Sequence, residues 1–370
     1  MKRVLGFVLL APALLLSGCL FSINQPLVMP GGSIALFLEA DGSYALAPEG
    51  GVLHLFRNDA WIPVPGAALS VTGSLLDVSV DGAELLYMNV ESDELFEPPG
   101  MTLHCVATEP NAVPTRLLET ERWIAKAAWT REGEILLLFF GDEAAGTLER
   151  LNRATGELEV LQDSVLSFEY HAEDGTIDLV GIDQDGDLVA GYVERWDPAT
   201  ERRSELTVFV CNQPTIELYA MLPHALLWNA SSDGRWLALA LYDATMMEPL
   251  LEQDAPDLYL VDAEFEAVER IAVGGVMPAF SPDSRTLAYL TAATGVMDGG
   301  TAVIRTRDLT TGTESVVPVS LGASTLLWLG PNRLGMIFEE DDDHARLVEI
   351  DLATSEMIER IAVPAGAAEE

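Results

Sequence analysis

Short turn motifs recur along the chain at a nearly constant distance. Each turn is an Asp-Gly pair or a close equivalent, set between two apolar runs of four to eight residues. The turns begin at Asp41, Asp81, Glu132, Asp185, Asp233, Asp283 and Pro331, which are 40, 51, 53, 48, 50 and 48 residues apart. A unit repeated at about 40–50 residues indicates a repeat architecture in which each unit packs on its neighbours.

Every unit has the pattern of four β-strands. Two apolar runs flank the tight turn, and a variable loop leads to a hairpin of two more polar runs. The closing hairpins also repeat, because Glu269–Val273 has the same sequence as Glu359–Val363. We therefore predict an all-β fold, a seven-bladed β-propeller of four-stranded antiparallel blades, over residues 33–364.

The clearest copy of the unit runs from Met277 to Leu290. Its segment Pro278–Tyr289 resembles the TolB-type, WD-repeat-like blade of bacterial periplasmic propellers, and Asn229–Leu239 and Ala128–Phe139 match it in part. The resemblance implies the fold and leaves the function to be argued from a site.

The fourth unit has two candidate turns. Asp174-Gly175 follows Ser167–Tyr170, whereas Asp185-Gly186 makes the spacing more even. We prefer Asp185, which makes Val165–Gly175 an insertion before blade four.

The N-terminal segment has the pattern of a lipoprotein signal peptide. Lys2 and Arg3 precede an apolar run, Val4–Leu16, that is shorter than the roughly 20 residues of a membrane-spanning helix. The run ends in Leu16-Ser17-Gly18-Cys19, which resembles the lipobox in which the cysteine is acylated. We predict a signal peptide over 1–18, a lipid-anchored tether over 19–32 and a C-terminal tail over 365–370.

Charge and the tether define the expected location. The chain has 20 Lys and Arg against 59 Asp and Glu, a net charge of −39. This acidic protein is not expected to bind nucleic acid, so the lipid chains at Cys19 would hold it to the membrane. Leu20 after the cysteine resembles lipoproteins sorted to the outer membrane, which predicts a location in the bacterial cell envelope, at the outer membrane and facing the periplasm or the exterior.

Patterns of catalytic chemistry are weak. There is no G-x-S-x-G nucleophile motif, and the five histidines lie in different units without metal-ligand spacing. Asp183–Glu194 superficially resembles a calcium loop, but Leu188 stands where the sharp turn needs Gly. Glu339–His344 reads as a solvated acidic loop, with weak divalent binding as the alternative. We predict no metal site and no cofactor.

Aromatic and cysteine positions are interpreted as structural. Trp129, Trp328 and Phe280 lie three residues before their turns and Trp228 lies five before its own, which favours packing between blades over a ligand box. Cys105 and Cys211 fall two blades apart and are expected to be separate thiols.

Long loops between the second and third strands are the most informative functional feature. They are Glu91–Gly100, Asp142–Gly146, Asp243–Asp257, Thr291–Gly300 and Glu339–His344. We predict that this rim binds a protein partner through apolar anchors surrounded by acids. The anchors are Met246, Met247, Leu250 and Leu251, and the acids are Asp142, Glu143, Glu252, Asp254 and Asp257.

These features favour a lipid-anchored, non-catalytic scaffold for protein interaction or ligand binding, and not an enzyme. The alternative is an enzyme or binder that uses the channel of the propeller to act on a small molecule or polysaccharide. A cluster of titratable side chains with shifted pKa values in the channel would favour this alternative.

Overall fold

The computed structural model describes most of the chain between Ile34 and Ala362. The described ranges are 34–38, 43–47, 52–57, 60–68, 74–79, 81–91, 100–109, 112–140, 145–172, 174–185, 188–210, 227–242, 256–264, 267–292, 302–321, 323–330, 332–341, 344–354 and 356–362. These residues form strands and turns without a helix, so an all-β fold is confirmed for them. Accordingly, no helix long and apolar enough for a membrane span occurs in this part of the chain.

The strands fall into six antiparallel sheets. The first two sheets are β1 (Ile34–Leu38), β2 (Ser43–Ala47), β3 (Val52–Arg57) and β4 (Ala60–Ala68), then β5 (Ser74–Val78), β6 (Glu84–Glu91), β7 (Gly100–Ala107) and β8 (Thr115–Thr120). The third has seven strands: β9 (Trp123–Trp129), β10 (Ile135–Phe140), β11 (Gly146–Leu151), β12 (Leu158–His171), β13 (Thr176–Asp185), β14 (Leu188–Asp197) and β15 (Arg202–Val210).

The remaining three sheets again have four strands each. They are β16 (Trp228–Ala230), β17 (Trp236–Leu241), β18 (Asp257–Asp262) and β19 (Ala267–Ala272); β20 (Gly275–Phe280), β21 (Thr286–Ala292), β22 (Ala302–Asp308) and β23 (Glu314–Leu321); and β24 (Ala323–Gly330), β25 (Arg333–Asp341), β26 (His344–Asp351) and β27 (Glu356–Ala362).

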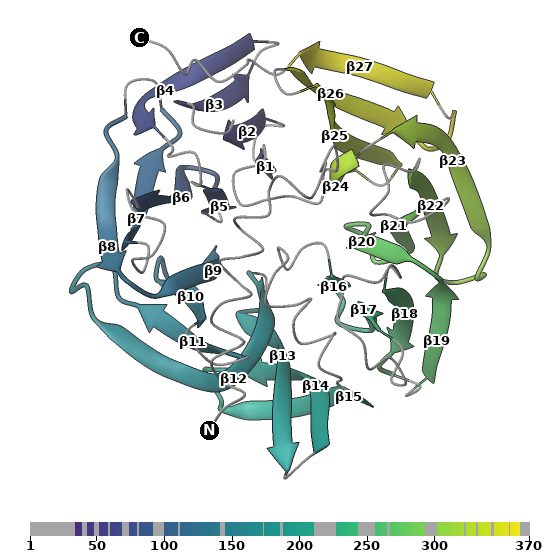
Figure 1. The fold of residues 1–370 in the computed structure, drawn as a ribbon, viewed down its shortest axis with the longest axis horizontal. Coiled ribbons are helices and arrows are strands. Elements are labelled where there is room, and N and C mark those ends of the chain that lie inside the picture. The colour runs from purple at the N-terminus through teal and green to yellow at the C-terminus, as the bar shows by residue number, and fades with distance from the viewer. Residues whose placement is uncertain are drawn as a thin grey trace, which may run out of the picture.

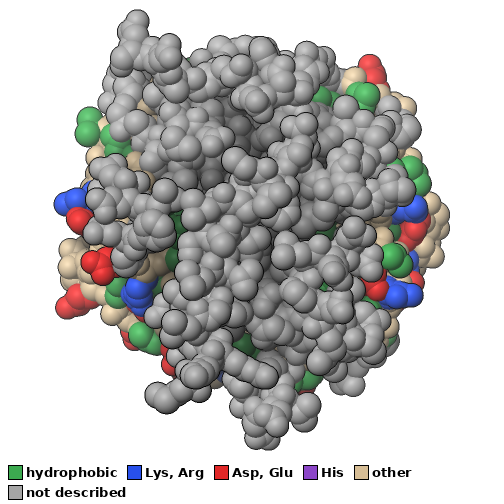
Figure 2. Space-filling model, in the orientation of Figure 1, with side chains coloured by type: hydrophobic (Ala, Val, Ile, Leu, Met, Phe, Trp, Pro, Cys, Tyr) green, Lys and Arg blue, Asp and Glu red, His purple; other side chains and the backbone are tan. Residues whose placement is uncertain are grey.

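The sheets are arranged radially around a common centre (Figure 1). The first strand of each four-stranded sheet lies nearest the centre and contacts the first strand of the next sheet, as β5 does with β9 and β20 with β24. β1 contacts β24, so the first and last sheets also lie side by side. Around the rim, acidic and basic side chains lie next to one another in the described part of the surface (Figure 2).

β12 belongs to both halves of the seven-stranded sheet. Its first half pairs with β11, and after a register irregularity at Val165 its second half pairs with β13. The turn that follows β12 contains Asp174-Gly175, with Gly175 at φ 79°. Asp185 instead lies in the hairpin between β13 and β14, where it pairs with Leu188. The prediction that Asp185 begins the fourth turn is therefore wrong, and Val165–Gly175 is a strand with its turn rather than an insertion.

Side-chain hydrogen bonds explain why the turn motif recurs. In the turn after β20, Ser281 Oγ donates to Asp283 Oδ1 and accepts the backbone N–H of Thr286, at 2.6 Å and 2.9 Å. Ser231 and Asp233 make the same contact at 2.6 Å after β16. A short serine followed two residues later by aspartate thus satisfies the backbone of the tight turn.

Packing between sheets uses the aromatic residues that the sequence places before the turns. The Trp228 indole N–H on β16 donates to Ser167 Oγ on β12 at 2.6 Å, and that of Trp328 on β24 donates to the Ala279 carbonyl on β20 at 2.8 Å. Trp129 and Trp228 are buried, at 3% and 2% exposure. The prediction that these rings pack between neighbouring sheets is confirmed.

Candidate functional site

Three charged side chains come together on consecutive innermost strands. Asp77 lies on β5, Lys126 on β9, and Glu169 on the second half of β12. Apart from Lys2, Lys126 is the only lysine of the whole sequence. We call Asp77, Lys126 and Glu169 the inner-strand cluster.

Asp77 is held by the free edge of the neighbouring sheet. β9 is an edge strand, so N–H groups on its outer side have no partner within their own sheet. The Trp129 backbone N–H of β9 donates to Asp77 Oδ2 at 2.6 Å. Burial raises the pKa of Asp77 to about 7, although the hydrogen bond from Trp129 and the charge of Lys126 act in the opposite direction.

Lys126 and Glu169 form an ion pair beside this carboxyl group. Lys126 Nζ lies 2.7 Å from Glu169 Oε2, and it also lies over the Phe168 ring, 5.3 Å from the centroid. The two charged side chains are 21% and 37% exposed, so the pair is partly open to solvent. The negative charge of Glu169 also contributes to the raised pKa of Asp77, after the larger effect of burial.

This arrangement has the components of proton-transfer chemistry. A carboxyl group with a pKa near 7 is present in both protonation states at neutral pH, which is the condition for an efficient general acid or base. The Lys126 ammonium can attract a carbonyl oxygen or a hydroxyl group of a ligand. Shifted pKa values next to a charge partner are enriched at functional sites, so the inner-strand cluster is our candidate site.

A second charged group lies in the same region but is structural. Asp178 on β13 is fully buried and binds Arg195 through both carboxylate oxygens at 2.6 Å, with His171 Nε2 at 2.7 Å. Burial raises the pKa of Asp178, but the hydrogen bonds from Arg195 and His171 together with their charges outweigh this effect and hold the pKa below its ordinary value. The Arg195 guanidinium also occupies the space beside Gly234, where a Cβ would lie 1.5 Å from its Nη1. Through Arg195, this network connects β13 and β14 to the turn after β16.

Most of the residues proposed from the sequence lie outside the described part of the chain. These are Cys19, Asp142, Glu143, Met246, Met247, Leu250, Leu251, Glu252 and Asp254. Asp257, the first residue of β18, is described, and its Oδ2 binds Arg270 Nη1 at 2.9 Å. The long segments do join second to third strands, such as β6 to β7 and β17 to β18. The partner-binding rim itself stays a prediction.

Other sequence features take simple structural roles. The segment that resembles a calcium loop is the β13–β14 hairpin, and its Glu194 is paired with Arg203. Cys105 on β7 is a buried free thiol, while Cys211 lies outside the described residues. Among the described side chains, no group of three or more histidines, cysteines or carboxylates is arranged to hold a metal ion.

None of the three members of the inner-strand cluster was predicted from the sequence. Two signals point to them. Lys126 is a lone lysine within an apolar strand, and Asp77 interrupts the apolar run Leu75–Val78. A charge inside an apolar strand has to be paired or neutralised, so such positions are candidates for a charge cluster.

Comparisons with solved structures show the fold of the chain. The β-propeller domain of the Trilobed protease from Pyrococcus furiosus aligns with TM-score 0.56 and 11% identity over 93% of this chain and 100% of that chain. Periplasmic gluconolactonase from Pseudomonas aeruginosa aligns with TM-score 0.55 and 14% identity over 90% and 96%. TolB from Acinetobacter baumannii aligns with TM-score 0.48 and 12% identity over 90% and 79%. No protein-family model and no curated protein matches the sequence.

These similarities confirm a β-propeller fold, in agreement with the blade motif in the sequence. They also correct one expectation. The prediction that the chain is not an enzyme is wrong, because a chain of the same fold is a gluconolactonase. Fold therefore gives no ground for excluding catalysis, and function depends on the site.

Proposed function

We propose that this protein binds and chemically transforms a small uncharged ligand at the inner-strand cluster, with Asp77 as the group that gives or takes a proton. One observation carries the proposal. A carboxyl group whose pKa is about 7 lies on the inner edge of the ring of sheets, next to the Lys126–Glu169 pair. Such a titratable cluster supports an enzyme or binder that uses the channel.

Opening of a cyclic ester is the reaction that fits these groups. Water adds to the carbonyl carbon, the ring C–O bond breaks, and Asp77 moves the proton that the ring oxygen receives. Lys126 would attract the carbonyl oxygen as negative charge develops on it. A sugar lactone is a reasonable substrate class, since it is uncharged and a gluconolactonase shares the fold. A polyanionic saccharide is disfavoured by the net charge of −39.

The finer architecture and location belong to the same proposal. β12 serves as the last strand of one four-stranded unit, β9–β12, and as the first strand of the next, β12–β15. Counted in this way, the six sheets contain seven blades. The lipobox ending at Cys19 supports a lipid-anchored protein of the bacterial cell envelope, and Leu20 supports the outer membrane.

Lactone hydrolysis by the purified full chain tests the proposal. Acid release from glucono-1,5-lactone is followed with a pH indicator for the wild type, Asp77→Asn and the control Asp81→Asn, an exposed turn residue. We expect turnover above the buffer rate with an inflection near pH 7, and a loss of about 10²–10⁴-fold in kcat for Asp77→Asn alone. Asn keeps an oxygen for the Trp129 N–H, so the variant should fold.

Two outcomes contradict this function. The wild type fails to accelerate the reaction over buffer, or Asp77→Asn hydrolyses the lactone at the wild-type rate while the circular dichroism spectra agree.

A further inference from the structure

A cavity of about 530 Å³ lies away from the inner-strand cluster, along β13, β14 and β15. Its other side is formed by residues 162–164, where β12 crosses from one half of the seven-stranded sheet to the other. Ser164 has a positive φ of 61° at this crossing. The cavity therefore exists because one strand serves both halves of the sheet.

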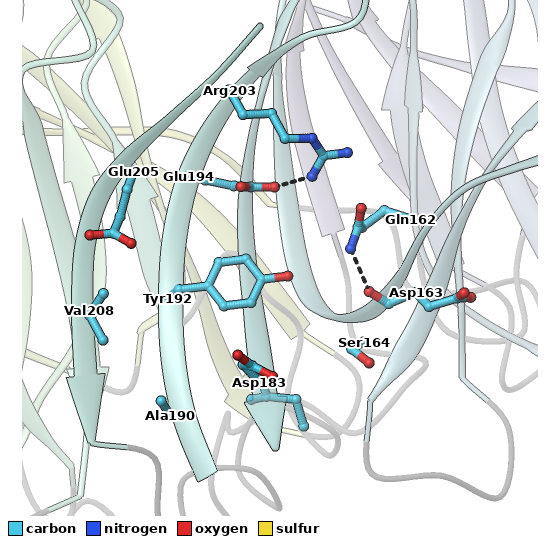
Figure 3. A pocket seen from close by; sticks show the side chains of 11 residues that line it. Gln162, Asp163, Ser164, Asp183, Ala190, Tyr192, Glu194, Arg203, Glu205 and Val208 are labelled. Atoms are coloured by element: carbon cyan, nitrogen blue, oxygen red, sulfur yellow. Dashed lines mark hydrogen bonds and ion pairs between the residues drawn. The ribbon is translucent and has the colours of Figure 1, made fainter. Parts of the chain in front are cut away.

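Tyr192 lies at the centre of the cavity (Figure 3). Its cross-strand partner is Gly181, and a Cβ at that position would lie 2.3 Å from the ring. The missing side chain lets the Tyr192 ring lie against the backbone of β13, so its other face is available to the cavity. Burial, followed by the charge of Glu194, raises the pKa of the phenol, so the ring stays neutral at physiological pH.

The surroundings of this ring are negatively charged. The lining contains four carboxylates, Asp163, Asp183, Glu194 and Glu205, and one cation, Arg203, which gives a net charge of 1 − 4 = −3. Arg203 is already paired with Glu194 (Figure 3). The cavity thus offers three further carboxylates around an aromatic face, on two sides of the ring.

The same sheet contains a cation that is already bound between an aromatic ring and a carboxylate. Trp196 lies on the same face of β14 as Tyr192, and Arg203 lies over it with the guanidinium carbon 4.7 Å from the ring centroid. Here an aromatic ring, a cation and the Glu194 carboxylate form a complete set. No cation lies over Tyr192 among the described side chains, although four carboxylates line the cavity that contains it.

We propose that this cavity is a binding site for an organic cation, an amine or polyamine whose ammonium group lies over Tyr192 and between Asp163, Asp183 and Glu205. A cation gains from the ring face and from the carboxylates together. The net charge of −39 would also attract such a ligand over a distance and slow its escape at low salt. An anionic ligand is repelled, and a neutral sugar finds few free donors in the lining.

Titration calorimetry of the full chain with spermidine tests this inference. We expect saturable binding to one site, weakened at least fivefold by Tyr192→Leu and by Asp183→Asn, and weakened further when salt is raised from 50 to 500 mM. Glu121→Gln, an exposed acid at the turn before β9, is the control and should leave the affinity unchanged. Glucose and gluconate serve as neutral and anionic probes that should not bind.

Asp183 is exposed, so its variant reports on the ligand even where Tyr192→Leu affects folding. Weak binding of many spermidine molecules that neither variant changes would overturn the site, since it reflects the overall charge alone. Saturable binding of glucose at Tyr192 in place of spermidine would overturn the ligand class. Neither result bears on lactone hydrolysis at Asp77, so the two proposals fail separately.

Discussion

Asp77 and Asn229 occupy the same position in their respective sheets and make the same contact. Each lies four residues before its turn, at Asp81 and Asp233. Asp77 Oδ2 accepts the backbone N–H of Trp129 at 2.6 Å, and Asn229 Oδ1 accepts that of Phe280 at 3.0 Å. An amide is therefore sufficient to join two innermost strands. What Asp77 adds is a titratable proton, which the structural contact does not require.

The first prediction concerns the pH dependence of stability. The pKa of Asp77 is raised from 3.8 to about 7 in the folded protein, so folding favours its protonated form. Its contribution to stability is complete below pH 3.8 and is lost as the pH rises to about 7. Asp77→Asn should remove this loss and make the protein more stable than the wild type at pH 8. The expected gain in the free energy of unfolding is at least about 1 kcal/mol and at most a few kcal/mol.

Urea unfolding of both proteins between pH 4 and pH 8 measures the effect. The informative quantity is the difference between the two curves, because other carboxylates titrate equally in both proteins. A difference that does not change with pH would contradict the raised pKa.

The second prediction concerns the buried network around Asp178. Asp178→Ala leaves Arg195 and His171 without their shared acceptor, and removing one partner of a buried pair costs about 3–5 kcal/mol. The lowered pKa of Asp178 means that its stabilisation is present above about pH 3.8 and is lost as the pH falls below that value. Urea unfolding at pH 7 gives the loss. Asp174→Asn, an exposed neighbour that keeps an oxygen for the Thr176 N–H, should change stability by less than about 0.5 kcal/mol; equal losses in the two variants would refute the role of the network.

The strand-turn pattern was sufficient to predict the fold because the turns use local chemistry. Ser281 and Asp283 bind backbone groups within five residues, so the signal is contained in the sequence itself. The fourth turn was misplaced for a physical reason. Asp174-Gly175 and Asp185-Gly186 are both suitable for tight turns by sequence. Asp174-Gly175 follows β12, and Asp185 is the last residue of β13, before the chain returns as β14. Even spacing could not decide which of them joins the first and second strands.

The candidate site could not be predicted in the same way. Asp77 and Glu169 are 92 residues apart in sequence and come together only when two sheets, β5–β8 and β9–β15, pack against each other. The cavity at Tyr192 depends on β12 being shared between two halves of a sheet, and no local sequence pattern predicts this sharing. The lone Lys126 was visible in the composition, but its partner Glu169 was one of 59 acidic residues.

The third prediction concerns the membrane anchor. If Cys19 is acylated, Cys19→Ser should prevent processing and release the protein from the membrane fraction, because burial of the acyl chains supplies the attachment. Fractionation of cells and the mass of the mature N-terminus measure this. Cys105→Ser is the control, since that thiol is buried in the folded protein and should not affect attachment. Wild-type membrane retention of the Cys19 variant would rule the anchor out.

The fourth prediction concerns the long loop between β17 and β18. Replacing Met246, Met247, Leu250 and Leu251 together with Ser should abolish crosslinks to a protein partner in native membranes, because these residues are the proposed apolar anchors. The matched control replaces two exposed valines elsewhere, Val113 and Val268, which are 82% and 59% exposed. An unchanged crosslinking pattern in the loop variant would show that the loop is not the contact.

The fifth prediction uses two buried indoles that differ in one hydrogen bond. Trp228 donates to Ser167 Oγ at 2.6 Å, whereas the Trp129 Nε1–H has no acceptor among the described residues. Trp→Phe removes the same volume at both positions, so the cavity cost is similar. Only Trp228→Phe also leaves a buried hydroxyl without its partner, and it should destabilise the protein by about 1–2 kcal/mol more than Trp129→Phe. Urea denaturation at pH 7 gives both free energies of unfolding. The double variant Trp228→Phe with Ser167→Ala should be more stable than Trp228→Phe, because it also removes the unpartnered hydroxyl. Equal losses in the two single variants, with no such recovery in the double variant, would mean that the Ser167 hydroxyl finds another partner once the indole is gone.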